Sequence, residues 1–170
     1  NEADMAFFPA TELPPDFHSL RIYRSKKGIL VRDGHPVIEA YEKAGVMTWE
    51  LLNRWPAVCV TAGMKDGGAK SVEGRRVGVV LPYFLTVPYV VARTDFTFEG
   101  PLITLRRFMM DSQFQFRILP MPEESGPFEP RLVWHHCSHT DPFLQWVRGL
   151  VVDAARSEAR LLGVIDTSEE

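Results

Sequence analysis

The sequence lacks the motifs of several large enzyme classes. No GxxxxGK[ST], no GxGxxG after a predicted strand, no GxSxG and no HExxH occurs in its 170 residues. These absences disfavour nucleotide hydrolysis, dinucleotide-dependent redox chemistry and serine hydrolysis. The most apolar stretch, residues 77–92, contains Pro82 and Pro88 and is too short to cross a bilayer, so we expect no membrane span.

Cysteine is scarce and neither sign of charge dominates. Cys59 and Cys137 lie far apart and form no CxxC pair, which predicts reduced thiols in a cytoplasmic protein. The acidic segment from Asn1 to Ala10 lacks the basic start and apolar core of a signal peptide. Nineteen basic and 22 acidic side chains give a formal charge of −3, which predicts no nucleic-acid partner.

Length and composition are those of one globular domain. Apolar residues make up 45% of the chain and charged residues 24%, both ordinary values. The segment 1–16 contains Pro9, Pro14 and Pro15 and is predicted to be a flexible arm. A single α+β domain is expected over residues 17–166, with a short tail at 167–170.

Turn and capping residues predict two short helices early in the domain. Pro36 stands where a helix prefers to begin, and Gly45 marks its end. Thr48 is positioned to cap a second helix that stops before Pro56.

Most of the following chain has the pattern of long strands. Five apolar segments are separated by Gly, Pro, Asp and Ser, which is typical of strands joined by turns. They are residues 77–85, 87–98, 102–110, 114–119 and 132–139. Because most gaps are short, antiparallel pairing is expected.

A long amphipathic helix is predicted at the C-terminal end. Thr140 or Asp141 can cap it and Pro142 fits its first turn. One helical face carries the apolar residues Phe143, Val147, Leu150, Val151, Ala154, Leu161 and Ile165. That face is expected to lie against the sheet.

The residues 134–139 hold three of the five histidines. On a strand, His135, Cys137 and His139 would share one face, where two imidazoles and a thiol could ligate zinc. Alternatively, His135 or His136 lines a ligand site or transfers protons near neutral pH. A purely structural role is the third interpretation, and the sequence leaves all three open.

The order of these elements resembles the helix-grip fold of START and Bet v 1-like proteins. The segment Thr48-Trp49-Glu50-Leu51-Leu52 is similar to the "VWELL" phrase common in their first helix, and the terminal helix from Asp141 also fits. The resemblance implies a curved antiparallel sheet that grips the terminal helix around a cavity for an apolar ligand. Some relatives of this kind are cyclases or hydrolases, and many only bind.

The expected function is therefore binding of an apolar small molecule, lipid-like or polyketide-like, with or without cyclase-type chemistry by His135 or His136. Arg93 is expected to orient the ligand. The expected apolar walls are Phe96, Phe98, Phe108, Phe116, Trp134, Val147 and Leu150. This reading requires no cofactor. The alternatives are a metal-assisted enzyme that uses zinc on His135, Cys137 and His139, and a non-catalytic protein-interaction module; the oligomeric state stays open.

Overall fold

The chain forms two compact units. The computed structural model describes residues 3–8, 13–61, 74–122 and 126–165. Unit 1 consists of residues 1–26 and 127–170, and unit 2 of residues 27–126. The predicted tail at 167–170 lies outside the described residues. We describe each unit by itself.

Unit 1 is built on a three-stranded antiparallel sheet in the order β1-β8-β2. Its strands are β1 (Met5–Phe8), β2 (Phe17–Arg21) and β8 (Arg131–His135). Residues 5–8, expected to belong to a flexible arm, instead pair with Arg131–Trp134. The prolines that suggested an arm flank this strand in sequence and do not interrupt it.

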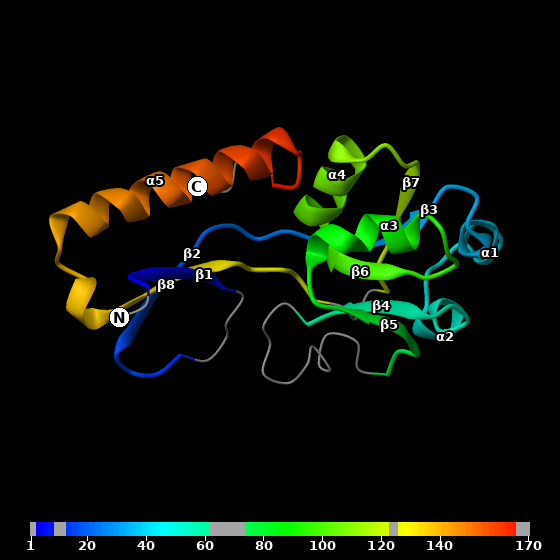
Figure 1. The fold of residues 1–170 in the computed structure, drawn as a ribbon, viewed down its shortest axis with the longest axis horizontal. Helices are drawn as coiled ribbons and strands as arrows, with labels where there is room; N and C mark the ends of the chain where they lie inside the picture. Colours follow the sequence, from blue (N-terminus) through cyan, green and yellow to red (C-terminus); the bar gives the residue numbers. More distant parts are fainter. Residues whose placement is uncertain (1–2, 9–12, 62–73, 123–125, 166–170) are drawn as a thin grey trace. The chain divides into compact units, whose positions relative to one another are not determined.

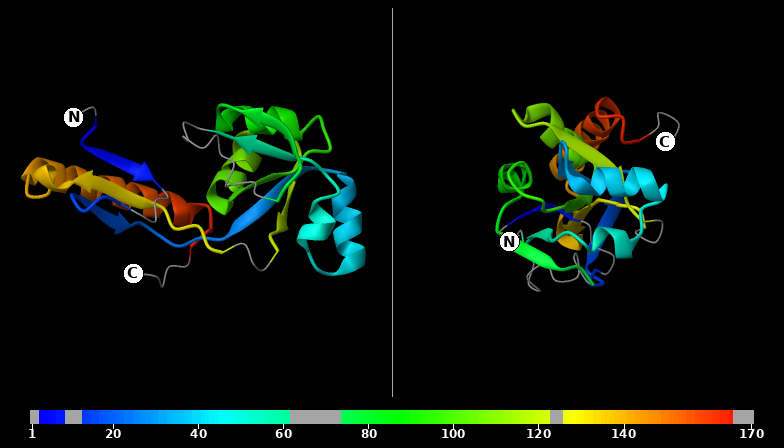
Figure 2. Two further views of the ribbon diagram at one scale, coloured as in Figure 1. Left: turned by 90° about the horizontal axis from the view of Figure 1, so that it is seen from below. Right: turned by 90° about the vertical axis from the view of Figure 1, so that its right-hand side faces the viewer.

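The predicted terminal helix is present as α5 (Pro142–Leu161). The Asp141 carboxylate accepts the Leu144 backbone N–H at 3.0 Å, and Pro142 lies in the first turn, as the sequence indicated. α5 runs along the sheet of unit 1 (Figures 1 and 2). Arg148 lies over the Trp134 ring at 4.7 Å, and Arg156 donates to the Ile22 carbonyl at 2.8 Å. These contacts attach the helix to β8 and to the end of β2.

The inward face of α5 is not the predicted one. Its buried residues are Arg148, Val152 and Ala159, whereas Leu150 is 50% exposed. Phe143 and Trp146 are also exposed, at 66% and 61%. The helix carries two apolar stripes, and periodicity alone does not distinguish which of two stripes packs inward.

Unit 2 contains two sheets. One is antiparallel in the order β6-β3-β7, and the other pairs β4 with β5 in parallel. The strands are β3 (Lys27–Arg32), β4 (Ala57–Val60), β5 (Val77–Leu81), β6 (Phe98–Pro101) and β7 (Phe116–Pro120). The parallel pair departs from the all-antiparallel expectation, because residues 62–76 provide a connection long enough for parallel strands.

The two early helices of unit 2 are confirmed. In α1 (Pro36–Ala44), His35 caps the start and Gly45 ends the helix with a left-handed φ of 72°, a conformation that glycine adopts without strain. In α2 (Trp49–Leu52), the Thr48 hydroxyl accepts the Leu51 N–H at 3.1 Å. Capping chemistry therefore located both helices correctly.

Two segments predicted as continuous strands contain helices. Residues 87–98 contain α3 (Val87–Val91), preceded by a 3₁₀ turn, η2 (Phe84–Thr86); residues 102–110 lie in α4 (Leu102–Asp111). Pro88 occupies the first turn of α3, where its missing N–H costs nothing. In α4 the buried Leu105 and Phe108 are three residues apart, which is helical spacing. Short apolar runs do not by themselves distinguish strand from buried helix.

The predicted helix-grip architecture is wrong. No single curved sheet encloses α5 in the described part of the chain; the strands belong to three sheets in two units. Unit 2 has a core that does not involve α5. Its buried members are Leu30, Val58, Val60, Val87, Val91, Phe98, Leu105, Phe108 and Phe116. None of the described helices combines the length and apolarity required to span a bilayer.

Candidate functional site

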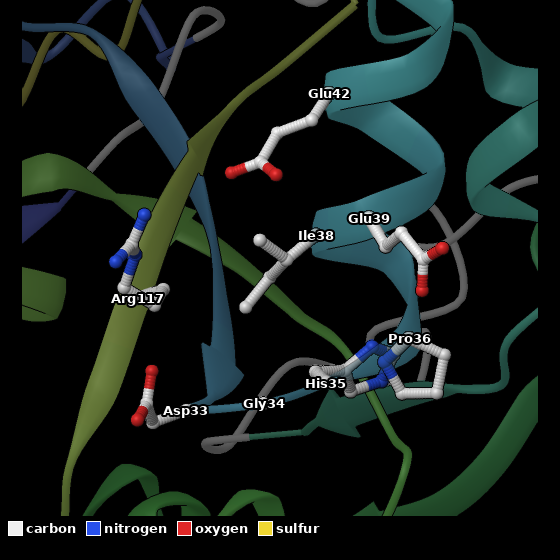
Figure 3. Close-up of a pocket in the computed structure, with 8 residues that line it drawn as sticks. All are labelled: Asp33, Gly34, His35, Pro36, Ile38, Glu39, Glu42 and Arg117. Carbon is white, nitrogen blue, oxygen red and sulfur yellow. The ribbon is translucent and has the colours of Figure 1, made fainter.

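A pocket of about 310 Å³ lies in unit 2, beside the start of α1 and the strand β7. It begins at the turn after β3, where Asp33 and Gly34 reverse the chain before helix α1. The lining residues are Asp33, Gly34, His35, Pro36, Ile38, Glu39, Glu42 and Arg117. Figure 3 shows Arg117 on β7 and Glu42 and Ile38 on α1, on opposite sides of the space.

His35 is the buried residue of this pocket's lining. Its side chain is 1% exposed, its Nδ1 accepts the Val37 N–H at 3.0 Å, and Trp55 packs edge-on against the ring. The Nε2 group has no hydrogen-bond partner within the described residues. Burial lowers the pKa of His35, and interactions with Asp95 partly oppose that effect. His35 is therefore a neutral capping residue that sets the direction of α1.

The pocket presents both signs of charge to solvent. Asp33, Glu39 and Glu42 supply three exposed carboxylates, and Arg117 supplies an exposed guanidinium. A guanidinium binds a carboxylate through two parallel hydrogen bonds, and carboxylates accept hydrogen bonds from hydroxyl or ammonium groups. The lining is thus suited to a small polar molecule that carries an acid group together with hydroxyl or amino groups.

The predicted ligand-binding residues divide between the two units. Phe98, Phe108 and Phe116 are buried together in the core of unit 2, and Phe96 packs against them. Arg93 is exposed, with its guanidinium 4.8 Å from the Phe114 ring centroid. In unit 1, Trp134 is buried under Arg148, Val147 is half-buried and Leu150 is exposed. A ligand-binding role for these residues stays a prediction.

The strand that holds the histidines ends earlier than expected. β8 stops at His135, and a 3₁₀ turn, η4 (His136–Ser138), follows. The turn brings His139 back beside Trp134, whose indole N–H donates to His139 Nδ1 at 3.2 Å. The alternation of faces expected for residues 134–139 therefore fails after His135.

His135, Cys137 and His139 do not form a preorganised metal site. His135 Nδ1 accepts the Cys137 backbone N–H at 3.2 Å, and His139 Nδ1 is occupied by Trp134. No group of three or more His, Cys, Asp or Glu side chains suited to a metal is found among the described residues. Catalytic roles for His135 and His136 stay predictions.

The turn brings His136 and His139 together with a histidine from another strand. His18, on β2, lies 2.9 Å through its Nε2 from His136 Nδ1, and its ring stacks on His139 with centroids 4.0 Å apart. Partial burial lowers the pKa of His18, and His139, His136 and Arg148 lower it further. This contact was not predicted, because 118 positions separate His18 from His136 and no local pattern connects them.

Comparison with curated proteins finds transcriptional regulators. The chain is 26% identical over 162 residues to the HTH-type transcriptional regulator SyrM 1 of Sinorhizobium fredii. The aligned residues cover 91% of this chain and 46% of that protein. A SyrM of Rhizobium etli is 23% identical over 155 residues, 85% of this chain and 43% of that protein. The chain thus spans about half the length of these relatives. No family model matches it.

Comparison with solved structures identifies the fold. The regulatory domain of MexT, a transcriptional activator of Pseudomonas aeruginosa, superposes with a TM-score of 0.68 and 22% identity, covering 89% of this chain and 74% of that domain. The regulatory domain of MetR, a LysR family regulator from N. meningitidis, gives 0.70 at 11% identity, covering 99% and 77%. The chain has the fold of these regulatory domains. The START and Bet v 1 resemblance is therefore wrong.

A third structure in this group carries a ligand. The effector binding domain of QuiR, determined in complex with shikimate, superposes with a TM-score of 0.65 and 12% identity, covering 92% of this chain and 73% of that domain. None of the site residues predicted from the sequence lines the unit 2 pocket. The local feature of the sequence that lies there is the turn Asp33-Gly34, which directly precedes the predicted helix start at Pro36.

Proposed function

We propose that this chain is the small-molecule-sensing part of a LysR-type transcriptional regulator. The observation that carries the proposal is the fold, shared over about nine-tenths of the chain with regulatory domains of that group. The similarity to SyrM regulators supports the same role independently. In such a protein, DNA contact is assigned to residues outside this chain, consistent with its formal charge of −3. The proposed function therefore implies that this protein is located in the cellular compartment that contains DNA.

The unit 2 pocket is the proposed place of ligand contact in the described part of the chain. Its guanidinium and three carboxylates favour a small acid with hydroxyl or amino groups over the apolar ligand expected from the sequence. Arg117 would pair with the acid group of the ligand, while Asp33 and Glu42 would accept hydrogen bonds from its hydroxyls. Shikimate, a hydroxylated carboxylate bound by the QuiR domain, is a suitable probe of this chemistry.

Calorimetric titration of shikimate into the purified chain tests the proposal. Saturable binding at one site is expected, and Arg117→Gln should weaken it at least about tenfold, because one charge-assisted pair is lost. Arg76→Gln is the matched control: Arg76 is an exposed arginine of the same unit outside the pocket. Binding that is absent, or that is equally weakened by both variants, would refute the proposed ligand chemistry.

A further inference from the structure

Two imidazole nitrogens in unit 1 face each other. His18 Nε2 and His136 Nδ1 are 2.9 Å apart, on side chains from β2 and from the turn η4. Neither residue belongs to the unit 2 pocket or has a place in the proposed ligand contact. Two neutral imidazoles in this arrangement share one hydrogen between nitrogens that are both potential metal ligands.

The surrounding chain holds both rings in place. His18 is paired in register with Trp134 across the strands β2 and β8, and its ring stacks on His139. His136 is anchored through its backbone N–H, which donates to the Asp16 carbonyl at 2.7 Å. Arg148 fastens the far end of the turn by donating to the Ser138 and His139 carbonyls. The two nitrogens are thus positioned by backbone structure, with His136 at the exposed side.

We propose that His18 Nε2 and His136 Nδ1 bind a divalent transition-metal ion, copper(II) or zinc(II), with water completing the coordination. Metal–imidazole bonds of about 2.0–2.1 Å place two ligand nitrogens about 3.3 Å apart at the tetrahedral angle of zinc and about 2.9 Å apart at the right angle of square-planar copper(II). The observed separation of 2.9 Å is close to both values. A small rotation of the exposed His136 ring opens the pair enough to admit the ion.

Binding at this pair conserves charge and protons. Each imidazole enters neutral and keeps one N–H, on His18 Nδ1 and on His136 Nε2, while the two facing nitrogens donate lone pairs to the metal. The hydrogen formerly shared moves to an outer nitrogen through solvent. No oxidant, reductant or additional base is required.

The proposed site has two protein ligands, and this sets its affinity and selectivity. His139 does not join, because its ring stacks on that of His18 with centroids 4.0 Å apart, and the in-plane lone pairs of two stacked rings do not converge on one ion. No three-ligand group is found among the described residues. The positive charge of Arg148 acts on His18 and weakens the binding of a metal cation there. Imidazole ligands favour copper(II) over zinc(II) in the usual order of divalent ions, and magnesium prefers oxygen ligands.

Titration of the purified chain with CuCl₂, ZnCl₂ and MgCl₂ tests the inference. One equivalent of copper should bind more tightly than one of zinc, and magnesium should give no signal. His136→Asn, at an exposed turn position, should weaken both transition metals at least about tenfold, and His18→Asn should do the same. His135→Asn is the matched control, because asparagine can retain the cap on the Cys137 N–H that His135 provides.

Nitrogen-15 NMR of the imidazoles supplies a second readout for zinc. The His18 Nε2 and His136 Nδ1 resonances should move on binding while those of His135 stay in place. The inference is overturned if no one-equivalent zinc or copper binding occurs, or if folded His136→Asn protein binds as tightly as the unmodified chain. It is equally overturned if His135→Asn loses as much affinity as His136→Asn, which would place the metal on another set of side chains.

Discussion

The two units each bury an arginine, but they compensate its charge differently. In unit 2, Arg75 forms an ion pair with Glu99 and also donates to Asn53 Oδ1 and Thr97 Oγ1. In unit 1, Arg148 donates to two backbone carbonyls and lies over an indole ring. In unit 2, two opposite charges, those of Arg75 and Glu99, are buried together. In unit 1, the single charge of Arg148 is buried against carbonyl dipoles and the face of the Trp134 ring. A buried cation is thus stabilised by a carboxylate partner in unit 2, whereas the described residues of unit 1 stabilise theirs through carbonyl oxygens and an aromatic ring.

Removal of Arg75 should have the largest effect. Arg75→Met leaves Glu99 buried without its partner, and a broken buried pair costs about 3 to 5 kcal/mol of unfolding free energy. Burial raises the pKa of Glu99 and Arg75 lowers it, so loss of the arginine raises that pKa further. Urea unfolding at neutral pH measures the loss of stability.

Arg148→Met is the matched variant in unit 1 and should cost less, about 1 to 3 kcal/mol. The two carbonyls it leaves are neutral, and a methionine side chain retains contact with the Trp134 ring. The same urea unfolding applies. A larger loss for Arg148→Met than for Arg75→Met would contradict the distinction between the two buried arginines.

The two stripes of α5 provide a second contrast, of intermediate size. Val152 is 5% exposed and Leu150 is 50% exposed. Val152→Ala should lower the unfolding free energy by about 1.5 to 3 kcal/mol, through lost burial and the cavity that remains. Leu150→Ala should change it by no more than about 0.5 kcal/mol, as surface substitutions generally do. If thermal or urea unfolding showed a larger loss of stability for Leu150→Ala than for Val152→Ala, the inward face of α5 would be the one predicted from the sequence.

The smallest predicted effect is a pH dependence due to His35. Its pKa is lowered from 6.5 in the folded chain, so the unfolded state binds more protons in that range. Its contribution to stability is present above about pH 6.5 and is lost as pH falls through the folded-state pKa. His35→Asn keeps a capping side chain but cannot titrate. The stability of the variant, relative to the unmodified chain, should therefore improve on acidification; an unchanged difference between pH 7.5 and 5 would show that His35 is not buried neutral.

Local signals in the sequence located those elements that depend on local chemistry. Several helix ends of the structure were marked by residues in the sequence: Pro36 and Gly45 for α1, Thr48 for α2, and Asp141 and Pro142 for α5. These signals succeed because a cap is made between residues a few positions apart. The same local reading placed the start of α5 correctly without revealing what the helix packs on.

Features that depend on distant contacts were missed. Segments 87–98 and 102–110 are apolar enough for a strand or a buried helix, and their surroundings decide between the two. The outward stripe of α5 is as apolar as the inward one, which contains the arginine at position 148. The unit 2 pocket joins residues 33–42 to Arg117 through the pairing of β3 with β7. No pattern within either segment indicates that pairing.

Backbone NMR mapping of ligand contact tests the central claim most directly. Shikimate, added to the isotope-labelled chain, should shift the amide resonances of residues 33–42 and of Arg117 saturably, with a common apparent dissociation constant. Amides of β1 and β8 in unit 1 should not respond with that constant. Saturable shifts confined to unit 1, or no saturable shift anywhere in the chain, would contradict the assignment of small-molecule binding to the unit 2 pocket.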